Sequence, residues 1–175
     1  MNKTLKVLKE RRSVKKFKDT QVEKELLNEI LEAGTYAANG RGAQAGLMVV
    51  IQNLELIRKL EKLNAEISGI SQAKPFYNAP TVVVVFANSS LGTYIEDGSL
   101  VLGNLMTAAY ALGVDSCWIH RAREVFELEE GRKLAREWGV EDEYKGIGFC
   151  ILGYRDDNFN PVLKPRKDGF ITFVK

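Results

Sequence analysis

The feature that most constrains the fold is a run of β-branched residues ending in an aromatic, Thr-Val-Val-Val-Val-Phe at positions 81–86. A continuous apolar run of this kind is typical of a strand that is covered on both faces. The helix predicted after it, at 96–112, is apolar on nearly every side, which indicates that it too is largely buried. A chain of 175 residues is long enough to cover both within one domain, 1–175.

Helical and extended patterns alternate along the rest of the chain. Apolar residues at helical spacing predict helices over 3–10, 22–37, 54–67 and 124–138, the last interrupted near Gly131. Short apolar runs predict strands over 47–52, 114–120 and 146–154, and the alternating end at 170–174 could add as an edge strand. Thr-x-x-Glu patterns beginning at Thr20 and Thr93 predict two capping boxes. The alternation predicts an α/β or α+β sheet covered by helices.

The helix over 96–112 also predicts self-association. A chain this short has difficulty covering all sides of such a helix by itself. Gly98 and Gly103 each cost about 1 kcal/mol relative to alanine in a helix interior, a cost that is tolerable if another backbone packs close. We therefore expect a subunit interface along this helix.

Composition and charge exclude several classes of protein and site. A net charge of +2 is too small to argue for nucleic acid, and no apolar run approaches the roughly 20 residues of a membrane span. The start of the chain lacks the apolar core of a signal peptide. Cys117 and Cys150 lie in predicted strands without metal-ligand spacing, so we expect buried free thiols and a reducing cytoplasm. Because His120 is the single histidine, a multi-histidine metal site is excluded.

A dense basic segment follows the first predicted helix. Arg-Arg-Ser-Val-Lys-Lys at 11–16 places four cations and a hydroxyl within six residues. Guanidinium groups offer paired donors that match phosphate oxygens, so the segment could bind a phosphate. The alternative is a solvated basic stripe. A second pair of cations near the far end of the chain, Lys164 and Arg166, favours the phosphate interpretation.

The order of these motifs resembles that of the flavin-dependent nitroreductase family across essentially the whole chain. The residues that carry the resemblance are Arg-Arg-Ser-Val-Lys at 11–15, Gly-Arg-Gly-Ala-Gln at 40–44, Ala-Pro-Thr-Val-Val-Val at 79–84, Asp-Gly-Ser-Leu at 97–100, Ser-Cys-Trp-Ile at 116–119, Gly-Tyr at 153–154 and Lys-Pro-Arg at 164–166. The resemblance implies an α+β fold with a central, mainly antiparallel sheet flanked by helices. It also implies a homodimer with an exchanged C-terminal tail and with FMN at the interface.

The resemblance implies that two groups of residues, one near each end of the chain, bind FMN at or near its phosphate. Arg11, Arg12 and Ser13 match the amino-terminal flavin contacts, and Lys164 and Arg166 match the contacts that the tail makes with the phosphate. A phosphate monoester carries about two negative charges, and cations gathered around it make charge-assisted hydrogen bonds.

Other residues match positions around the flavin ring. Lys15 corresponds to the basic residue beside the pyrimidine edge, where a cation would stabilise the negative charge that builds up at N1 and O2 on reduction. Gln44 retains an amide that could bond the same edge. At Ile119, His120 and Arg121 the backbone should pass the ring near N5 and O4.

Several of these positions keep a second interpretation. His120 could donate a proton near neutral pH, or it could be a strand-end histidine bonded to backbone. Arg121 could contact the flavin, or it could pair with Glu124 or Glu127. Arg41 is either a solvent-facing loop residue or a second cation near the flavin or the nicotinamide phosphate.

The loop at 42–46 departs from the commoner family pattern. Many members have Asn-x-Gln-Pro-Trp there, whereas this chain has Gly-Ala-Gln-Ala-Gly. The missing Asn and Trp leave the usual substrate pocket open to question. Phe76, Tyr77 and Tyr94 are candidates for lining the slot.

The resemblance implies an oxidoreductase whose chemistry lies in the flavin. NADH or NADPH would deliver hydride to N5, and a nitroaromatic, quinone or related small-molecule acceptor would then take the same place, which gives ping-pong kinetics. No side chain needs to be catalytic, and His120 is the one candidate. The alternatives are a flavoprotein of the same fold with other chemistry, such as dehalogenation or flavin breakdown, and a non-enzymatic dimeric binding module.

Overall fold

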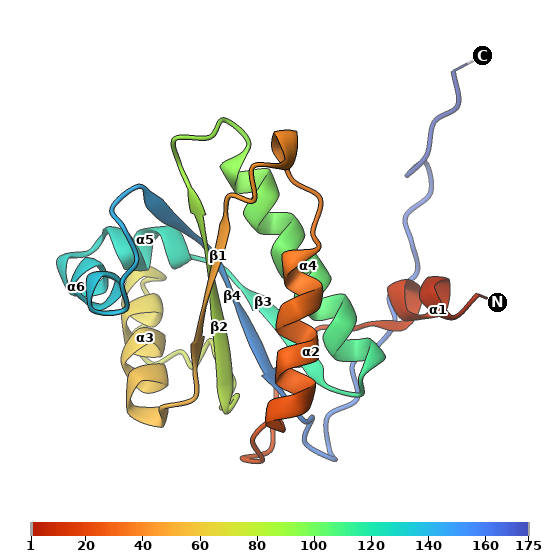
Figure 1. Ribbon diagram of the computed structural model, residues 1–175. Coiled ribbons are helices and arrows are strands. Elements are labelled where there is room, and N and C mark those ends of the chain that lie inside the picture. Colours follow the sequence, from red (N-terminus) through yellow and green to blue (C-terminus); the bar gives the residue numbers. More distant parts are fainter. Residues whose placement is uncertain (1, 175) are drawn as a thin grey trace.

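The protein is described by a computed structural model that covers residues 2–174. Its helices and strands follow one another along the chain as shown in Figure 1. In order they are α1 (Lys3–Glu10), α2 (Lys24–Thr35), the 3-10 turn η1 (Gly40–Gly42), β1 (Gly46–Ile51), α3 (Leu54–Ile67), β2 (Thr81–Asn88), α4 (Tyr94–Ala111), β3 (Asp115–Ile119), α5 (Ala122–Glu127), α6 (Glu129–Glu137) and β4 (Tyr144–Gly153).

The four strands form one antiparallel sheet in the order β1-β2-β4-β3. The valine-rich run is β2, an inner strand whose first seven residues are all buried. Val82 and Val84 face one core and Val83 and Val85 face the other, as the alternation of a strand requires. Because the pairings are antiparallel, the predicted α+β class with a central antiparallel sheet is confirmed.

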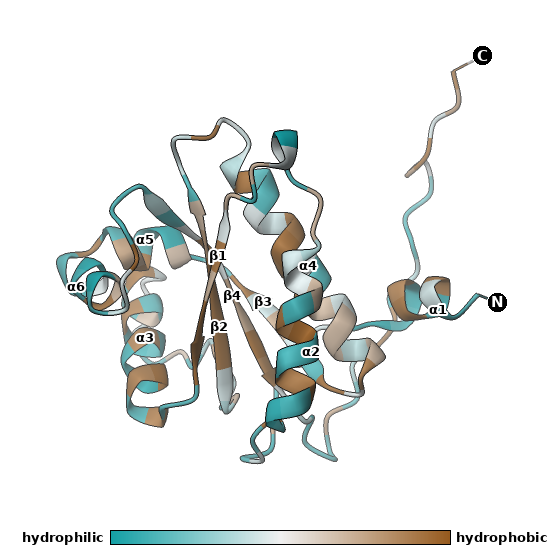
Figure 2. Ribbon diagram, in the orientation of Figure 1, coloured by the Kyte–Doolittle hydropathy of each residue, from teal (hydrophilic) through white to brown (hydrophobic). Residues whose placement is uncertain are grey.

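Helices cover both faces of the sheet. α3, α5 and α6 pack on one face, where Leu60, Phe126 and Leu134 join the core, and α2 and α4 pack on the other, where Ile30 and Leu105 do so. Figure 2 shows hydrophobic residues concentrated on the strands and on the sides of the helices that face them. No helix within residues 2–174 is long and apolar enough to span a bilayer.

The basic segment after α1 is anchored along the edge of the sheet. The Val14 amide donates to the Ser116 carbonyl of β3 (3.0 Å), and Ser13 and Phe17 form single β-bridges with Ser116 and Arg155. Val14 and Phe17 are buried, whereas Lys15 and Lys16 between them are exposed. The cations and the serine of the basic segment are therefore held beside β3.

Three local predictions are wrong. The capping boxes do not form, because Glu23 rather than Thr20 is the N-cap of α2, and the N-cap of α4, Thr93, makes no side-chain capping bond. The break in the last helical region lies at Leu128, which is extended between α5 and α6, and not at Gly131. Gly131 instead lets α6 pass close to α5, since a Cβ there would lie 1.9 Å from the Val125 carbonyl oxygen.

The C-terminal tail, residues 162–174, forms no strand and is exposed throughout. The predicted edge strand at 170–174 is therefore wrong for the single chain. Apolar side chains on the tail, among them Val162 and Phe173, lie open to solvent. In Figure 1 the tail runs past α1 and away from the sheet.

Candidate active site

A cleft of about 230 Å³ lies at the end of β3, and we call it the β3 cleft. Its lining residues come from four segments of the chain: Lys15, Asn64, Ser68, Pro75, Tyr77, Cys117, Trp118, Ile119, His120 and Arg121. Four of the predicted site residues, Lys15, Ile119, His120 and Arg121, thus meet in one place. The lining holds basic and aromatic side chains but no acidic one, which suits a planar, electron-rich or anionic ligand.

Two residues of the β3 cleft have an unusual backbone conformation. Arg121 and Tyr77 are left-handed, with φ of 75° and 52°. Non-glycine residues in sparsely populated regions cost of order 1–3 kcal/mol each, and they cluster at functional sites. The ammonium of Lys15 lies 6.0 Å from the centroid of the Tyr77 ring, at the limit of a cation–π contact. The walls of the cleft are therefore held in a specific conformation.

A second cleft of about 280 Å³ adjoins the first and shares Trp118 and His120 with it. Its other lining residues include Ile95, Ser99 and Ile147. The His120 side chain is exposed between the two clefts, and its backbone carbonyl accepts a bond from Asn64 Nδ2 (2.7 Å). Within residues 2–174 Arg121 forms no ion pair with Glu124 or Glu127, so its guanidinium is available to a ligand.

Arg11 carries a buried donor that the described chain does not satisfy. Its Nη1 atom is buried without a hydrogen-bond partner, as is the hydroxyl of Ser116 on the neighbouring strand. Leaving such a group unpaired costs about 1–3 kcal/mol, and more when it is charged. An anion beside Arg11 would remove this cost. Ser13, bridged to Ser116, is exposed beside it.

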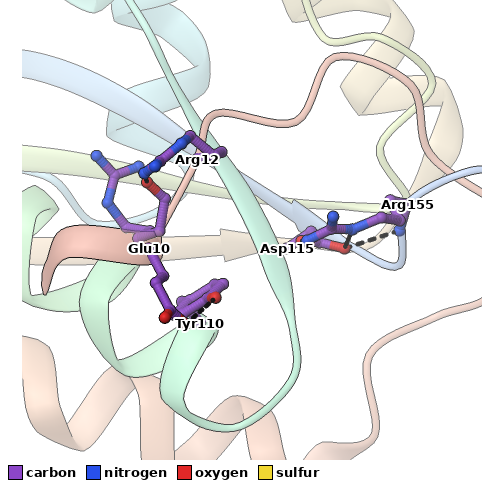
Figure 3. A network of polar contacts seen from close by, with 6 residues as sticks. Glu10, Arg12, Tyr110, Asp115 and Arg155 are labelled. Carbon is purple, nitrogen blue, oxygen red and sulfur yellow. Dashed lines mark hydrogen bonds and ion pairs between the residues drawn. The ribbon is translucent and has the colours of Figure 1, made fainter. Parts of the chain in front are cut away.

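Polar contacts fix the backbone around the basic segment (Figure 3). Arg12 donates from Nη1 to the carbonyls of Lys9 (2.8 Å) and Arg11 (2.6 Å), which ties it to the end of α1. Tyr110 of α4 donates a long bond of 3.4 Å to Glu10. Asp115 at the start of β3 is largely buried and pairs with Arg155 through both carboxylate oxygens, and this pairing raises the pKa of Arg155.

Gln44 lies on the opposite edge of the sheet from the β3 cleft. It precedes β1, so β2 and β4 separate it from β3, a separation of about 14 Å at roughly 4.8 Å per strand. Its backbone is left-handed (φ 49°), and its amide donates to Asn39 Oδ1 (2.9 Å). One chain therefore does not bring Gln44 to the cleft.

Sequence reasoning missed a residue that fixes the Gln44 loop. Asp97 lies in the first turn of α4, where an acid interacts favourably with the positive end of the helix dipole. In the structure its side chain is buried and accepts bonds from the Gly40 amide (2.9 Å) and the Thr93 hydroxyl (3.0 Å). No pattern in the sequence links these two segments.

Lys164 and Arg166 lie on the exposed tail. Arg166 Nη2 donates to the Lys164 carbonyl (2.8 Å), a local bond within the tail. Within residues 2–174, neither cation forms an ion pair with another part of the chain. In Figure 1 the tail passes α1 and leads away from the sheet. Phe76 is fully buried in the core and cannot line a slot, whereas Tyr77 lines the β3 cleft.

The molecule thus has an α+β fold with a basic cleft, lined also by aromatic side chains, at the edge of an antiparallel sheet. The chain belongs to the nitroreductase family, whose family model matches residues 8–154. The resemblance read from the motifs is therefore confirmed.

Three individual proteins show how far the similarity extends. A nitroreductase with bound FMN from Bacteroides fragilis is 27% identical, with a TM-score of 0.93 over 100% of both chains. A second nitroreductase with bound FMN, from Desulfitobacterium hafniense, is 28% identical, with a TM-score of 0.88 over 100% of both chains. A protein of Archaeoglobus fulgidus, provisionally described as an NADH dehydrogenase/NAD(P)H nitroreductase, is 29% identical over 92% of this chain and 95% of its own.

Proposed function

We propose that this chain is an FMN-dependent oxidoreductase that uses NADH or NADPH to reduce nitroaromatics, quinones or related acceptors. The observation that carries the proposal is the similarity over the full length of both chains to a nitroreductase with bound FMN, at a TM-score of 0.93. The name of the Archaeoglobus relative supports a nicotinamide nucleotide as the electron donor.

The residues present fit FMN. The buried, unpartnered Nη1 of Arg11 is suited to a phosphate oxygen, with Ser13 beside it and Arg12 at the end of α1. Lys164 and Arg166 would complete the phosphate site from the tail. The β3 cleft offers Lys15 for the pyrimidine edge, and backbone amides at Ile119, His120 and Arg121 for the opposite edge of the ring.

When bound, FMN would supply a ring that accepts a hydride from the nucleotide and passes the electron pair to the acceptor. The task of the chain is to hold the ring and to leave one face of it open. Lys15 places positive charge where the ring gains negative charge. His120, exposed between the two clefts, can hold or donate a proton beside the acceptor. Because both substrates would use one open face in turn, we expect ping-pong kinetics.

A homodimer would unite the two halves of the site. Gln44 and the tail cations lie away from the β3 cleft in one chain, so a partner copy must bring its own Gln44, Lys164 and Arg166 if they contact the same ligand. α4 has an open side for such a partner. A Cβ added at Gly98 would meet Ile147, whereas one added at Gly103 would meet no described atom within 4 Å.

Exposed apolar side chains support the same interface. Leu5 and Leu8 on α1 and Leu100 on α4 are each about half exposed, and the apolar residues of the tail are more exposed still. Covering these side chains would stabilise a dimer through the hydrophobic effect. We also place the protein in a reducing cytoplasm, in keeping with the free thiols of Cys117 and Cys150.

The test begins with the visible spectrum of the full chain as purified. We expect the absorbance of bound oxidised flavin, released as FMN on denaturation, and a dimeric mass by light scattering. NADH and NADPH should then bleach the flavin under anaerobic conditions, and nitroaromatics or quinones should restore it. A protein that neither carries nor binds added FMN would overturn the proposal.

A further inference from the structure

Helix α3 makes polar contacts with two different walls of the β3 cleft. Asn64 is only 3% exposed, and its Nδ2 donates to the His120 carbonyl at 2.7 Å. Glu61 accepts a bond from the Phe76 amide at 2.8 Å through Oε1. Residues three apart lie on the same side of a helix, so one side of α3 reaches both walls.

Each of these bonds ends next to a left-handed residue. Arg121 follows His120 directly and has a φ of 75°, and Tyr77 follows Phe76 directly and has a φ of 52°. Non-glycine residues keep this conformation only where the surrounding structure fixes it. The Phe76 side chain gives its turn a second anchor. It is fully buried, and the centroid of its ring lies 5.1 Å from that of Phe149.

The bond to His120 accounts for a polar residue at a core position. Asn64 lies one heptad after Ile57 and four residues after Leu60, both of which pack in the core. An apolar residue would be expected there, since a buried amide is unfavourable unless it is hydrogen-bonded. Asn64 is also not needed to begin the helix, because Asn53 caps it through the Leu56 amide (3.0 Å).

We propose that Asn64 and Glu61 are positioning residues for the active site: Asn64 orients the His120–Arg121 backbone, and Glu61 holds the Phe76–Tyr77 turn. The inference rests on the proposed function, because it assigns these walls to FMN and the acceptor. Asn64 acts through the backbone amides and the guanidinium that face the ring. Glu61 acts through Tyr77, whose ring lies beside Lys15.

The test compares variants of the full chain that lose one bond each. Asn64→Leu and Glu61→Met remove the donor and the acceptor with little change in size, and Asn64→Asp is a second variant of the first site. Glu61→Gln keeps an acceptor oxygen for the Phe76 amide. Asn53→Ala is the matched control, because it removes another side-chain bond to backbone at the far end of the same helix.

Hydrogen exchange of the FMN-free protein gives the first measurement. We expect Asn64→Leu to accelerate exchange at 119–122 and Glu61→Met to accelerate it at 76–79, with Glu61→Gln close to the parent. In the loaded enzyme, loss of Asn64 should weaken FMN binding and lower kcat by about three- to tenfold. Loss of Glu61 should raise the KM for the acceptor with little effect on kcat.

The inference is overturned if Asn64→Leu and Asn64→Asp match Asn53→Ala in exchange at 119–122 and in FMN affinity. The assignment of Glu61 is overturned if Glu61→Met and Glu61→Gln show the same amide exchange rates at 76–79. Because exchange is measured without FMN, this result is independent of the proposed function, which fails on its own if the parent protein does not bind FMN.

Discussion

The β3 cleft and the C-terminal tail both carry predicted site residues, but the chain supports them very differently. Around the cleft, α3 bonds to the His120 carbonyl and the Phe76 amide, which directly precede Arg121 and Tyr77. The start of β3 is fastened by the pair between the largely buried Asp115 and Arg155. Arg166 on the tail has only a local bond to the Lys164 carbonyl. A single chain thus builds the β3 cleft but makes only a local side-chain bond in the tail, which in the proposed dimer the partner would hold.

The largest expected effect comes from removing the tail. A chain that ends at Pro161 should bind FMN at least about 100-fold more weakly, since it loses two charge-assisted contacts of roughly 1.5–3 kcal/mol each. Its far-UV circular dichroism should be unchanged, because the tail forms no helix or strand. FMN fluorescence titration and light scattering measure affinity and mass.

A double substitution separates charge from apolar contact in the tail. Lys164→Ala with Arg166→Ala should lose most of the FMN affinity and remain a dimer, whereas Lys167→Ala serves as the control. An unchanged affinity in the truncated chain would break the comparison, because the β3 cleft would then suffice alone.

The next largest effect is expected at Arg11. Arg11→Ala should weaken FMN binding by about 10- to 100-fold, because its buried Nη1 has no partner among residues 2–174 and would bind the proposed phosphate. Arg12→Ala should have a smaller effect, since Arg12 already donates to two carbonyls. Lys9→Ala, which removes an exposed cation from the last turn of α1 just before Arg11, is the control in the titration. Equal affinities for Arg11→Ala and Lys9→Ala would remove Arg11 from the site.

A smaller effect concerns the pH dependence of stability. Burial raises the pKa of Glu61 above its ordinary value, outweighing the Phe76 bond and the nearby Lys74 and Arg58, which lower it. The folded state therefore favours the protonated carboxyl of Glu61. The stability that this protonation contributes is full below the pKa of Glu61 in the unfolded chain and is lost as pH rises through its pKa in the folded protein. At neutral pH, Glu61→Gln should equal or exceed the parent in stability, and the difference should vanish below about pH 4.

Urea unfolding at a series of pH values measures this difference. Glu29→Gln, at an exposed position in α2, is the control and should show no such trend. A Glu61→Gln protein that is less stable than the parent at neutral pH and gains on acidification would reverse the assigned sign.

The smallest effect is the reactivity of the two thiols. Burial raises the pKa of Cys150 to about 12 and also raises that of Cys117, although Ser13, Lys15 and Arg11 oppose the shift at Cys117. A thiol reagent at mildly alkaline pH should therefore react slowly with Cys117, which lines the cleft, and hardly at all with Cys150. Added FMN should slow the reaction at Cys117. Rapid reaction of both thiols would show that the cleft opens readily.

Much of the fold could be predicted because its signals are local. The valine run of β2 and the spacing of Ile57 and Leu60 in α3 each reveal burial within a few residues of sequence. The capping boxes failed because Thr20 and Thr93 matched a pattern whose hydrogen bonds depend on where each helix begins. The helix break was misplaced because Gly131 serves a close approach of α6 to α5, a contact between elements.

The site was predictable only in part. A signal for Asn64 was present, since a polar residue occupied an apolar position of α3, but its partner His120 lies 56 residues further along the chain. Asp97 gave no signal, because its bond to the Gly40 amide joins segments with no shared pattern.

Local sequence patterns were enough to predict the main helices and strands, the fold class and the residue types suited to a phosphate and a flavin. The tertiary structure alone decided that Lys15, His120 and Arg121 share a cleft while Gln44 and the tail lie away from it. The reason is physical: burial and helical spacing are encoded over a few residues, whereas the grouping of distant side chains depends on the order of strands in the sheet.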